Sequence, residues 1–155
     1  MAVEIERKFL VRGKSWRSAV ESQARVLQGY LASDAKVTVR VRVTGAAAYL
    51  TIKGATSGIS RSEYEYRIPV EDAQAMLRDL AMYPPIDKMR YRVRFGDHLW
   101  DLDLFAGENE GLAMAEVELG SEDEIFEVPE WAGDEVTGDP RYYNANLARH
   151  PFKRW

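Results

Sequence analysis

Pairs of carboxylate side chains, separated by a single residue, occur in two distant parts of this sequence. Glu4 and Glu6 lie near the N-terminus, with Lys8 two residues further on, and Glu116 and Glu118 form a second pair. In an extended chain each pair projects from one face, because successive side chains of a strand point to opposite faces. Carboxylates without histidine or cysteine companions favour Mg²⁺ or Mn²⁺, which prefer oxygen ligands. The spacing therefore indicates a divalent-metal site.

Basic side chains are grouped at the same spacing. Arg40 and Arg42 form one group, and Arg90, Arg92 and Arg94 form another. Arginine offers planar bidentate donors and lysine a point charge, and together they suit the oxygens of a linear polyphosphate. In hydrolysis, bound metal ions would neutralise phosphoryl charge and lower the pKa of a water, while the bases stabilise the transferred and leaving groups. A metal with a polyphosphate explains both signs of charge without a protein nucleophile.

The segments that carry these charges have a period of two, which is typical of β-strands. In residues 36–44, valines occupy every second position, while Thr38, Arg40 and Arg42 lie between them. The same division into an apolar and an ionic face recurs along the chain. The predicted strands are residues 3–11, 27–31, 36–44, 49–53, 61–68, 88–95, 99–105 and 114–119.

The arrangement of these strands follows from the charges on their polar face. A sheet with one face in water is the usual origin of such alternation. Here, however, acids and bases form separate groups, and like charges two residues apart repel. A closed barrel gives the same alternation and places the ionic face inside, where hydration must offset the cost of burying ions. We therefore predict an α+β fold in which an eight-stranded antiparallel β-barrel forms a charged tunnel and helices pack on its apolar exterior.

Helices are expected between and after these strands. An apolar stripe in residues 70–82 predicts a helix that packs on the sheet. Residues 121–124 fit a capping box that opens a short helix, and Asn144 fits the cap of a last helix that runs to Arg149. A further helix is predicted over residues 16–24.

Composition limits the class of protein. The 155 residues are 46% hydrophobic and 30% charged, without a repeat or linker, which predicts a single domain over residues 1–155. A net charge of -4 argues against a general nucleic-acid binder, and the absence of cysteine excludes disulfides and thiolate ligands. No apolar run approaches the length of a membrane span, and no basic leader is present. We expect a cytoplasmic protein, and exposed apolar helix surface would allow a homodimer.

The order of the charged groups resembles a known family over essentially the whole chain. These groups are Glu4-x-Glu6-x-Lys8, Arg40-x-Arg42, Lys53, Glu63-x-Glu65, Lys88-x-Arg90, Asp101-x-Asp103 and Glu116-x-Glu118. Together they are similar to the CYTH domain, also called the triphosphate tunnel metalloenzyme superfamily, and to its small bacterial members that act on inorganic triphosphate. The first motif alone is a weak pattern, but its placement with six later groups is highly specific.

The resemblance implies a role for each matched residue. The metal-ligand positions are Glu4, Glu6, Glu116 and Glu118, with Asp103 as a further ligand. The triphosphate-binding positions are Lys8, Arg40, Arg42, Lys53, Lys88 and Arg90. Tyr30 and Lys88 match the reaction centre, and supporting positions are Glu63, Glu65 and Arg92. The structural alternative for the charged residues is a salt bridge within the tunnel, and for Tyr30 a buried, hydrogen-bonded phenol.

Several activities occur on this fold, and fold alone does not choose among them. The first hypothesis is a metal-dependent triphosphatase acting on inorganic tripolyphosphate, because the lining suits phosphates and nothing obvious suits a nucleobase or a thiazolium ring. The alternatives are a class IV adenylyl cyclase, a thiamine or nucleoside triphosphatase, and a module that binds polyphosphate without hydrolysis. The two acid pairs favour a metal and catalysis over mere binding.

Overall fold

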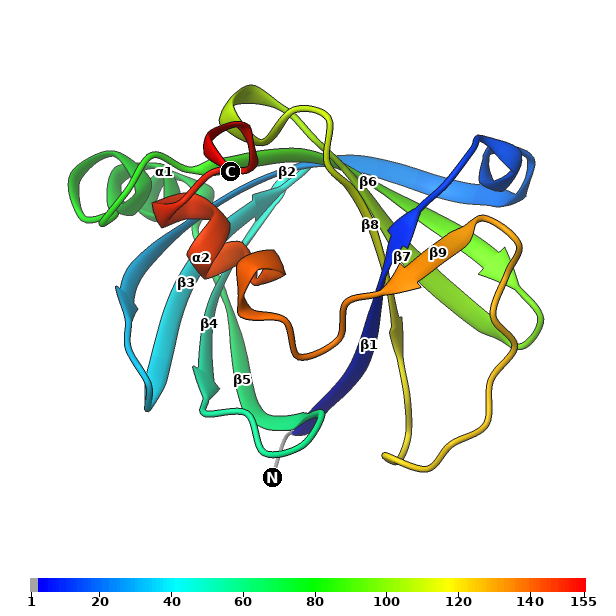
Figure 1. The fold of residues 1–155 in the computed structure, drawn as a ribbon. Coiled ribbons are helices and arrows are strands. Elements are labelled where there is room, and N and C mark those ends of the chain that lie inside the picture. The colour runs from blue at the N-terminus through cyan, green and yellow to red at the C-terminus, as the bar shows by residue number, and fades with distance from the viewer. Residues whose placement is uncertain (1–2) are drawn as a thin grey trace.

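Eight antiparallel strands close into a barrel in this computed structural model, which describes residues 3–155 (Figure 1). Around the barrel the order is β5, β4, β3, β2, β6, β7, β8 and β1, and β1 pairs with β5 to close the ring. The strands are β1 Val3–Val11, β2 Val20–Ser33, β3 Val37–Thr44, β4 Ala47–Gly54, β5 Ser60–Ile68, β6 Ile86–Phe95, β7 His98–Phe105 and β8 Ala113–Glu118. A short strand, β9 (Ala132–Glu135), pairs with the second half of β1. The predicted barrel is confirmed.

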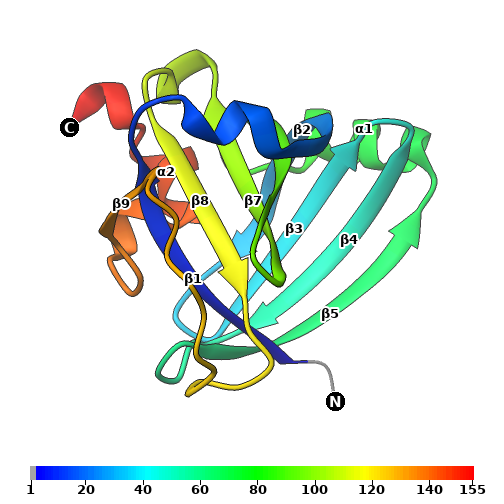
Figure 2. The same cartoon turned by 90° about the vertical axis from the view of Figure 1, so that its right-hand side faces the viewer.

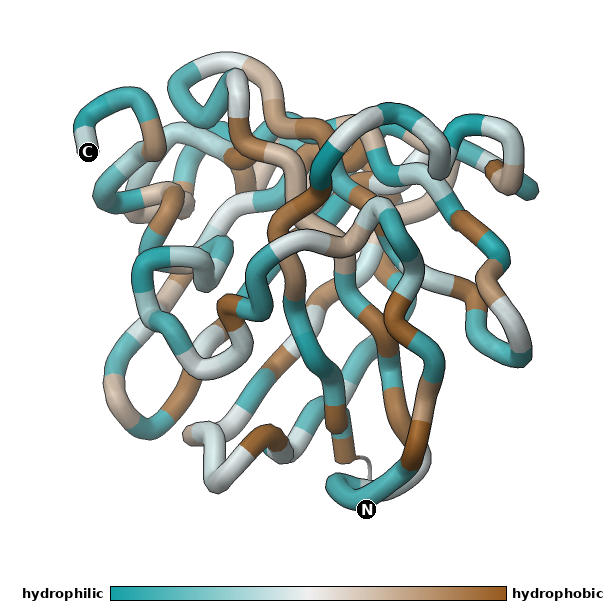
Figure 3. The backbone as a smooth tube through the Cα atoms, turned by 45° about the vertical axis from the view of Figure 1, so that its right-hand side comes forward, coloured by the Kyte–Doolittle hydropathy of each residue, from teal (hydrophilic) through white to brown (hydrophobic). Residues whose placement is uncertain are grey.

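The charged faces of the strands point into the barrel. Polar and apolar residues alternate along most of the strands, as the colours of Figure 3 show. Residues opposite one another in an antiparallel pair share a face, so the register decides which charges meet inside. Interior neighbours include Glu6 and Glu118, Lys8 and Glu116, Tyr30 and Arg40, and Arg90 and Asp103.

Helix α1 (Val70–Asp79) covers the outer face of β2, β3 and β4. The buried apolar cluster beneath it consists of Val41, Ala48, Ala73 and Leu77. At Gly29, on β2, an added Cβ would lie 2.7 Å from Leu77 Cδ2, so the absence of a side chain allows the helix to pack this closely. The helix is confirmed but ends three residues before the predicted limit at Met82.

A second part of the exterior, over β1, β6, β7 and β8, is covered by a 3-10 helix, η1 (Ser15–Ala19), and by the segment after β8. Its buried cluster contains Phe9, Trp16, Val93, Trp100, Leu102, Ala115, Val117, Leu119, Trp131 and Ala132. Figure 2 shows both covering segments beside the strands. The apolar faces of the barrel therefore form two cores against the surrounding segments.

The helix predicted over residues 16–24 is wrong. Only η1 is helical, and β2 begins at Val20. The reason is tertiary: Val20 and Ala24 pair with Val93 and Arg90 on β6, so hydrogen bonding to that strand overrides the local pattern.

The capping box predicted at residues 121–124 is also wrong, because that segment is a turn. The Ser121 hydroxyl donates to Asp123, and the Glu124 carboxylate accepts from the Gly120 backbone N–H and contacts His98. The side chains of Ser121 and Glu124 therefore form other hydrogen bonds and do not cap a helix.

The C-terminal part of the chain closes one end of the barrel. It contains η3 (Pro140–Tyr142), helix α2 (Asn144–Arg149) and η4 (Phe152–Arg154), and in Figure 1 α2 lies in front of the barrel opening. Leu147 and Ala148 pack in a cluster with Tyr30 and Phe105. Helix α2 is confirmed, but the Asn144 cap is wrong, because its side-chain oxygen accepts hydrogen bonds from the tunnel instead. None of the helices within residues 3–155 has the length and apolar character needed to span a membrane.

Candidate active site

A cavity of about 310 Å³ occupies the barrel interior next to α2. Strands on all sides and the start of α2 contribute its lining. The sequence-predicted residues in the lining are Glu4, Glu6, Lys8, Tyr30, Arg40, Arg42, Lys53, Lys88, Arg90 and Glu116. Other predicted residues, Asp103, Glu118, Glu63, Glu65 and Arg92, lie on the same strand faces but outside the lining. The structure thus brings ten of the predicted residues to one cavity.

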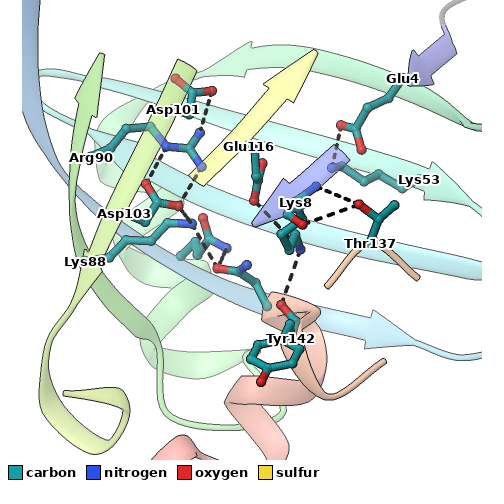
Figure 4. Close-up of polar contacts among 12 residues, drawn as sticks. Glu4, Lys8, Lys53, Lys88, Arg90, Asp101, Asp103, Glu116, Thr137 and Tyr142 are labelled. Atoms are coloured by element: carbon teal, nitrogen blue, oxygen red, sulfur yellow. Dashed lines mark hydrogen bonds and ion pairs between the residues drawn. The ribbon is translucent and has the colours of Figure 1, made fainter. Parts of the chain in front are cut away.

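Two bases of β6 surround Asp103 of β7 (Figure 4). Arg90 Nε and Nη2 each donate to Asp103 at 2.8 Å, and Lys88 Nζ lies 2.8 Å from Asp103 Oδ2. Burial acts to raise the pKa of Asp103, but the charges of Arg90 and Lys88 hold it at about 2. Burial lowers the pKa of Lys88 to about 7, and the pairing with Asp103 only partly opposes this. Asp103 is therefore a counter-ion of the basic wall.

Arg40 and Arg42 on β3 add positive charge that is less fully neutralised. Arg40 Nη2 donates to Thr51 at 3.2 Å and lies 3.7 Å from Glu65, and within residues 3–155 nothing accepts from its buried Nε. Burial, together with the charge of Arg40, lowers the pKa of Arg42 to about 9. Its Nε donates to the neutral oxygen of Gln28 at 2.8 Å. A buried donor without a partner and a guanidinium without a paired acid both favour an anionic ligand.

The acids on the opposite side form two carboxyl pairs. Glu63 hydrogen bonds with Glu4, and this contact, with burial, raises the pKa of Glu63 to about 7. Burial and the neighbouring charges of Glu116 and Glu4 raise the pKa of Glu6 to about 8. Lys53 lies 2.8 Å from Glu4. Near neutral pH each pair therefore retains a proton, because two adjacent carboxylates do not ionise together.

These acids fit a divalent cation that is completed by other oxygens. Within residues 3–155 no three acidic or histidine side chains form a ready metal cluster. The pairs Glu4–Glu63 and Glu6–Glu116 nevertheless present crowded oxygen donors. The raised pKa values of Glu63 and Glu6 indicate that the bases beside Glu4 and Glu116 do not offset this crowding. Mg²⁺ is commonly bound by one or two carboxylates together with water and substrate phosphates, so a full protein cage is unnecessary.

Sequence reasoning missed three residues of the cavity wall or its support. Arg61 Nε donates to Glu4 at 3.2 Å. Asn144 Oδ1 accepts from Lys88 Nζ at 2.9 Å, and Gln28 contacts Tyr30, Arg42 and Asn144. The period of two could have placed Gln28 beside Tyr30 and Arg61 beside Glu63, whereas Asn144 reaches the site only through the folding of the C-terminal segment.

A closed antiparallel tunnel lined by clustered bases and by carboxyl pairs defines the structural class. The chain belongs to the CYTH domain family, which it matches over residues 2–150. Membership of this family implies a divalent metal.

Curated relatives match almost the full length. An inorganic triphosphatase of Acetivibrio thermocellus is 48% identical over 155 residues, covering 100% of this chain and 99% of the relative. An inorganic triphosphatase of Nitrosomonas europaea is 38% identical over 149 residues, covering 94% and 96%.

Solved structures share the fold. A crystal structure of an inorganic triphosphatase has 36% identity and a TM-score of 0.64, covering 96% of this chain and 95% of the other. A putative adenylyl cyclase from Hippeastrum, described as having a dominant triphosphatase activity, has 12% identity and a TM-score of 0.60 over 76% of this chain and 80% of the other. At that identity the likeness extends to the fold alone.

Proposed function

We propose that this protein hydrolyses inorganic tripolyphosphate with a divalent metal. The observation that carries the proposal is the surplus of positive charge at Arg40 and Arg42, including a buried guanidinium N–H without an acceptor in residues 3–155. The cavity, at about 310 Å³, is at the small end for ligand sites, which suits a compact anion. The two curated relatives, named as inorganic triphosphatases, support this substrate.

The basic residues are proposed to bind the phosphoryl oxygens. They are Lys8, Arg40, Arg42, Lys53, Lys88 and Arg90. Asp103 keeps Lys88 and Arg90 in place through the contacts described above. Thr51 and Glu65 do the same for Arg40. Preorganised bases of this kind stabilise charge that develops on the transferred and leaving groups.

Mg²⁺ or Mn²⁺ is the proposed cofactor, held by Glu4, Glu6, Glu116 and Glu118. When bound, the ion would supply charge neutralisation and a water of lowered pKa. The crowding of Glu6 against Glu116 supports this assignment. The ionic contacts of Asp103 favour a positioning role over the metal-ligand role expected from sequence.

Tyr30 and Lys88 are the proposed residues of the reaction centre. Lys88 Nζ and the Gln28 amide both donate to Asn144 Oδ1, and the same amide donates to Tyr30 Oη at 2.9 Å. A lysine whose pKa is about 7 can stabilise a developing charge or exchange a proton near neutral pH. The Tyr30 hydroxyl would orient an oxygen of the substrate or of water.

A comparison of the products formed from three different triphosphates tests this function. Orthophosphate, pyrophosphate and cyclic nucleotide are measured after incubation with tripolyphosphate, thiamine triphosphate or ATP, each with Mg²⁺, Mn²⁺ or chelator. We expect the highest kcat/KM for tripolyphosphate, and no turnover of any of the three compounds in the presence of chelator. Efficient production of cyclic AMP would instead identify a cyclase, and tight binding without turnover of any compound would identify a binding module.

We also infer a single domain that acts on a small molecule in the cytoplasm, without nucleic acid or membrane as partner. Leu80 and Met82, which are 59% and 46% exposed after α1, provide an apolar surface for a homodimer. Light scattering at several protein concentrations checks this assembly, and a constant monomer mass would contradict it.

A further inference from the structure

Gln28 on β2 is a fully buried polar side chain behind the cavity. It is 0% exposed and does not line the cavity, yet it contacts three residues that do, Tyr30, Arg42 and Asn144. Its amide makes hydrogen bonds of 2.9 Å to Tyr30 Oη, 2.8 Å to Arg42 Nε and 3.2 Å to Asn144 Oδ1. A buried amide with this many partners constrains the orientation of each of them.

The direction of these bonds follows from Arg42. A guanidinium only donates hydrogen bonds, so the group facing Arg42 Nε must be the Gln28 oxygen. The Gln28 nitrogen then faces Tyr30 and Asn144 and donates to both. The contact with Arg42 thus fixes which way the amide is turned.

This orientation determines what the Tyr30 hydroxyl can do. Tyr30 Oη accepts the hydrogen bond from Gln28, so its own proton is directed elsewhere. Within residues 3–155 no group accepts a hydrogen bond from this hydroxyl, while Tyr30 lines the cavity. Tyr30 is therefore presented to the cavity as a hydrogen-bond donor.

The same amide leaves the charge of Arg42 available. A neutral oxygen satisfies the Nε of Arg42 without cancelling its positive charge. Arg90 on β6, by contrast, is bound by a carboxylate, that of Asp103. A glutamate at position 28 would have nearly the same shape but would pair with Arg42 and lose the donor to Tyr30. Glutamine is thus suited to both functions.

We propose that Gln28 is a positioning residue that directs the Tyr30 hydroxyl toward the bound anion and holds Arg42 in place without neutralising it. The catalytic part rests on the proposed triphosphatase function. The binding part concerns only an oligophosphate in the cavity. It can therefore be tested independently of whether the anion is hydrolysed.

A double-mutant cycle tests the catalytic part. Gln28→Met is expected to lower kcat for tripolyphosphate roughly tenfold, the size of one hydrogen bond of about 1.4 kcal/mol. In a Tyr30→Phe background the same change should leave kcat nearly unaltered, because the group through which Gln28 acts is gone. Equal losses of kcat in both backgrounds would overturn this role, since a purely structural defect would be additive.

Binding of tripolyphosphate, measured by calorimetry in chelator, tests the other part. Gln28→Glu is expected to weaken binding at least tenfold, whereas Gln28→Met should weaken it less because the charge of Arg42 is kept. Gln23→Met, at an exposed position of the same strand, is the matched control, with thermal unfolding recorded for every variant. Unchanged binding in Gln28→Glu would refute the assignment, while a wild-type protein that binds but lacks turnover would refute only the proposed function.

Discussion

Asp103 of β7 and Glu6 of β1 face the same tunnel but have opposite surroundings. Asp103 lies between Arg90 and Lys88, and its pKa is held at about 2 despite burial. Burial and the charge of Glu116, by contrast, raise the pKa of Glu6 to about 8. The difference shows that the charge of the neighbours, rather than residue type or spacing, decides whether a tunnel carboxylate is already neutralised or remains available to a cation.

The largest effect should come from removing the counter-ion of the basic wall. Asp103→Asn leaves Lys88 and Arg90 buried without their acid, and breaking such a pair costs about 3–5 kcal/mol. We expect a matching fall in the free energy of unfolding, measured by urea denaturation. Asp97→Asn, in an exposed turn, is the control and should have little effect. A stability equal to wild type would show that Asp103 is not the essential counter-ion.

A smaller effect, on activity instead of stability, is expected at Glu116. Glu116→Gln removes a charged oxygen donor from the proposed metal site, and turnover with Mg²⁺ should fall at least about 100-fold, as loss of a group that stabilises the reacting charge commonly does. The circular dichroism spectrum should remain that of the wild type. Full turnover in this variant would remove Glu116 from the metal site.

The smallest expected effect is a change in the pH dependence of Tm, measured without metal, when Glu6 is replaced. The folded protein holds a proton on Glu6 up to about pH 8, whereas an unfolded glutamate loses it near pH 4.3. Between these values the unfolded state binds fewer protons, so the contribution of Glu6 to stability declines as pH rises. Glu6→Gln should therefore raise Tm in chelator by a few degrees at pH 8 and little at pH 4.5.

The control for the pH experiment is Glu110→Gln, at an exposed turn. Its difference in Tm from wild type should not depend on pH over this range. If the Tm difference between Glu6→Gln and wild type were also independent of pH, Glu6 would not carry a raised pKa, and its contrast with Asp103 would be lost.

Much of the barrel could be predicted because a period of two survives wherever one face meets the tunnel and the other meets an apolar core. The first half of β2 lacks that pattern: Glu21, Ser22 and Gln23 follow one another, and pairing with β6 makes this segment a strand. Capping at residues 121–124 failed because Glu124 is engaged by Gly120 and His98.

The site was predictable only in part. Sequence spacing identifies Asp103 and Glu116 equally as acids of the tunnel. It does not reveal that Arg90 donates two hydrogen bonds to Asp103. Asn144 reaches the site through the packing of α2 at the barrel end, and its partners Lys88 and Gln28 are 56 and 116 residues away in sequence. Such contacts are set by register and tertiary closure, which periodicity does not encode.

The most direct test of the account is a time course of phosphate release from tripolyphosphate by the wild-type protein, with Mg²⁺ present from the start and chelator added midway. Cleavage of one anhydride bond should release orthophosphate and pyrophosphate in equal amounts, and both should stop when the metal is removed. No release before the chelator, or release that continues unchanged after it, would contradict a metal-dependent triphosphatase.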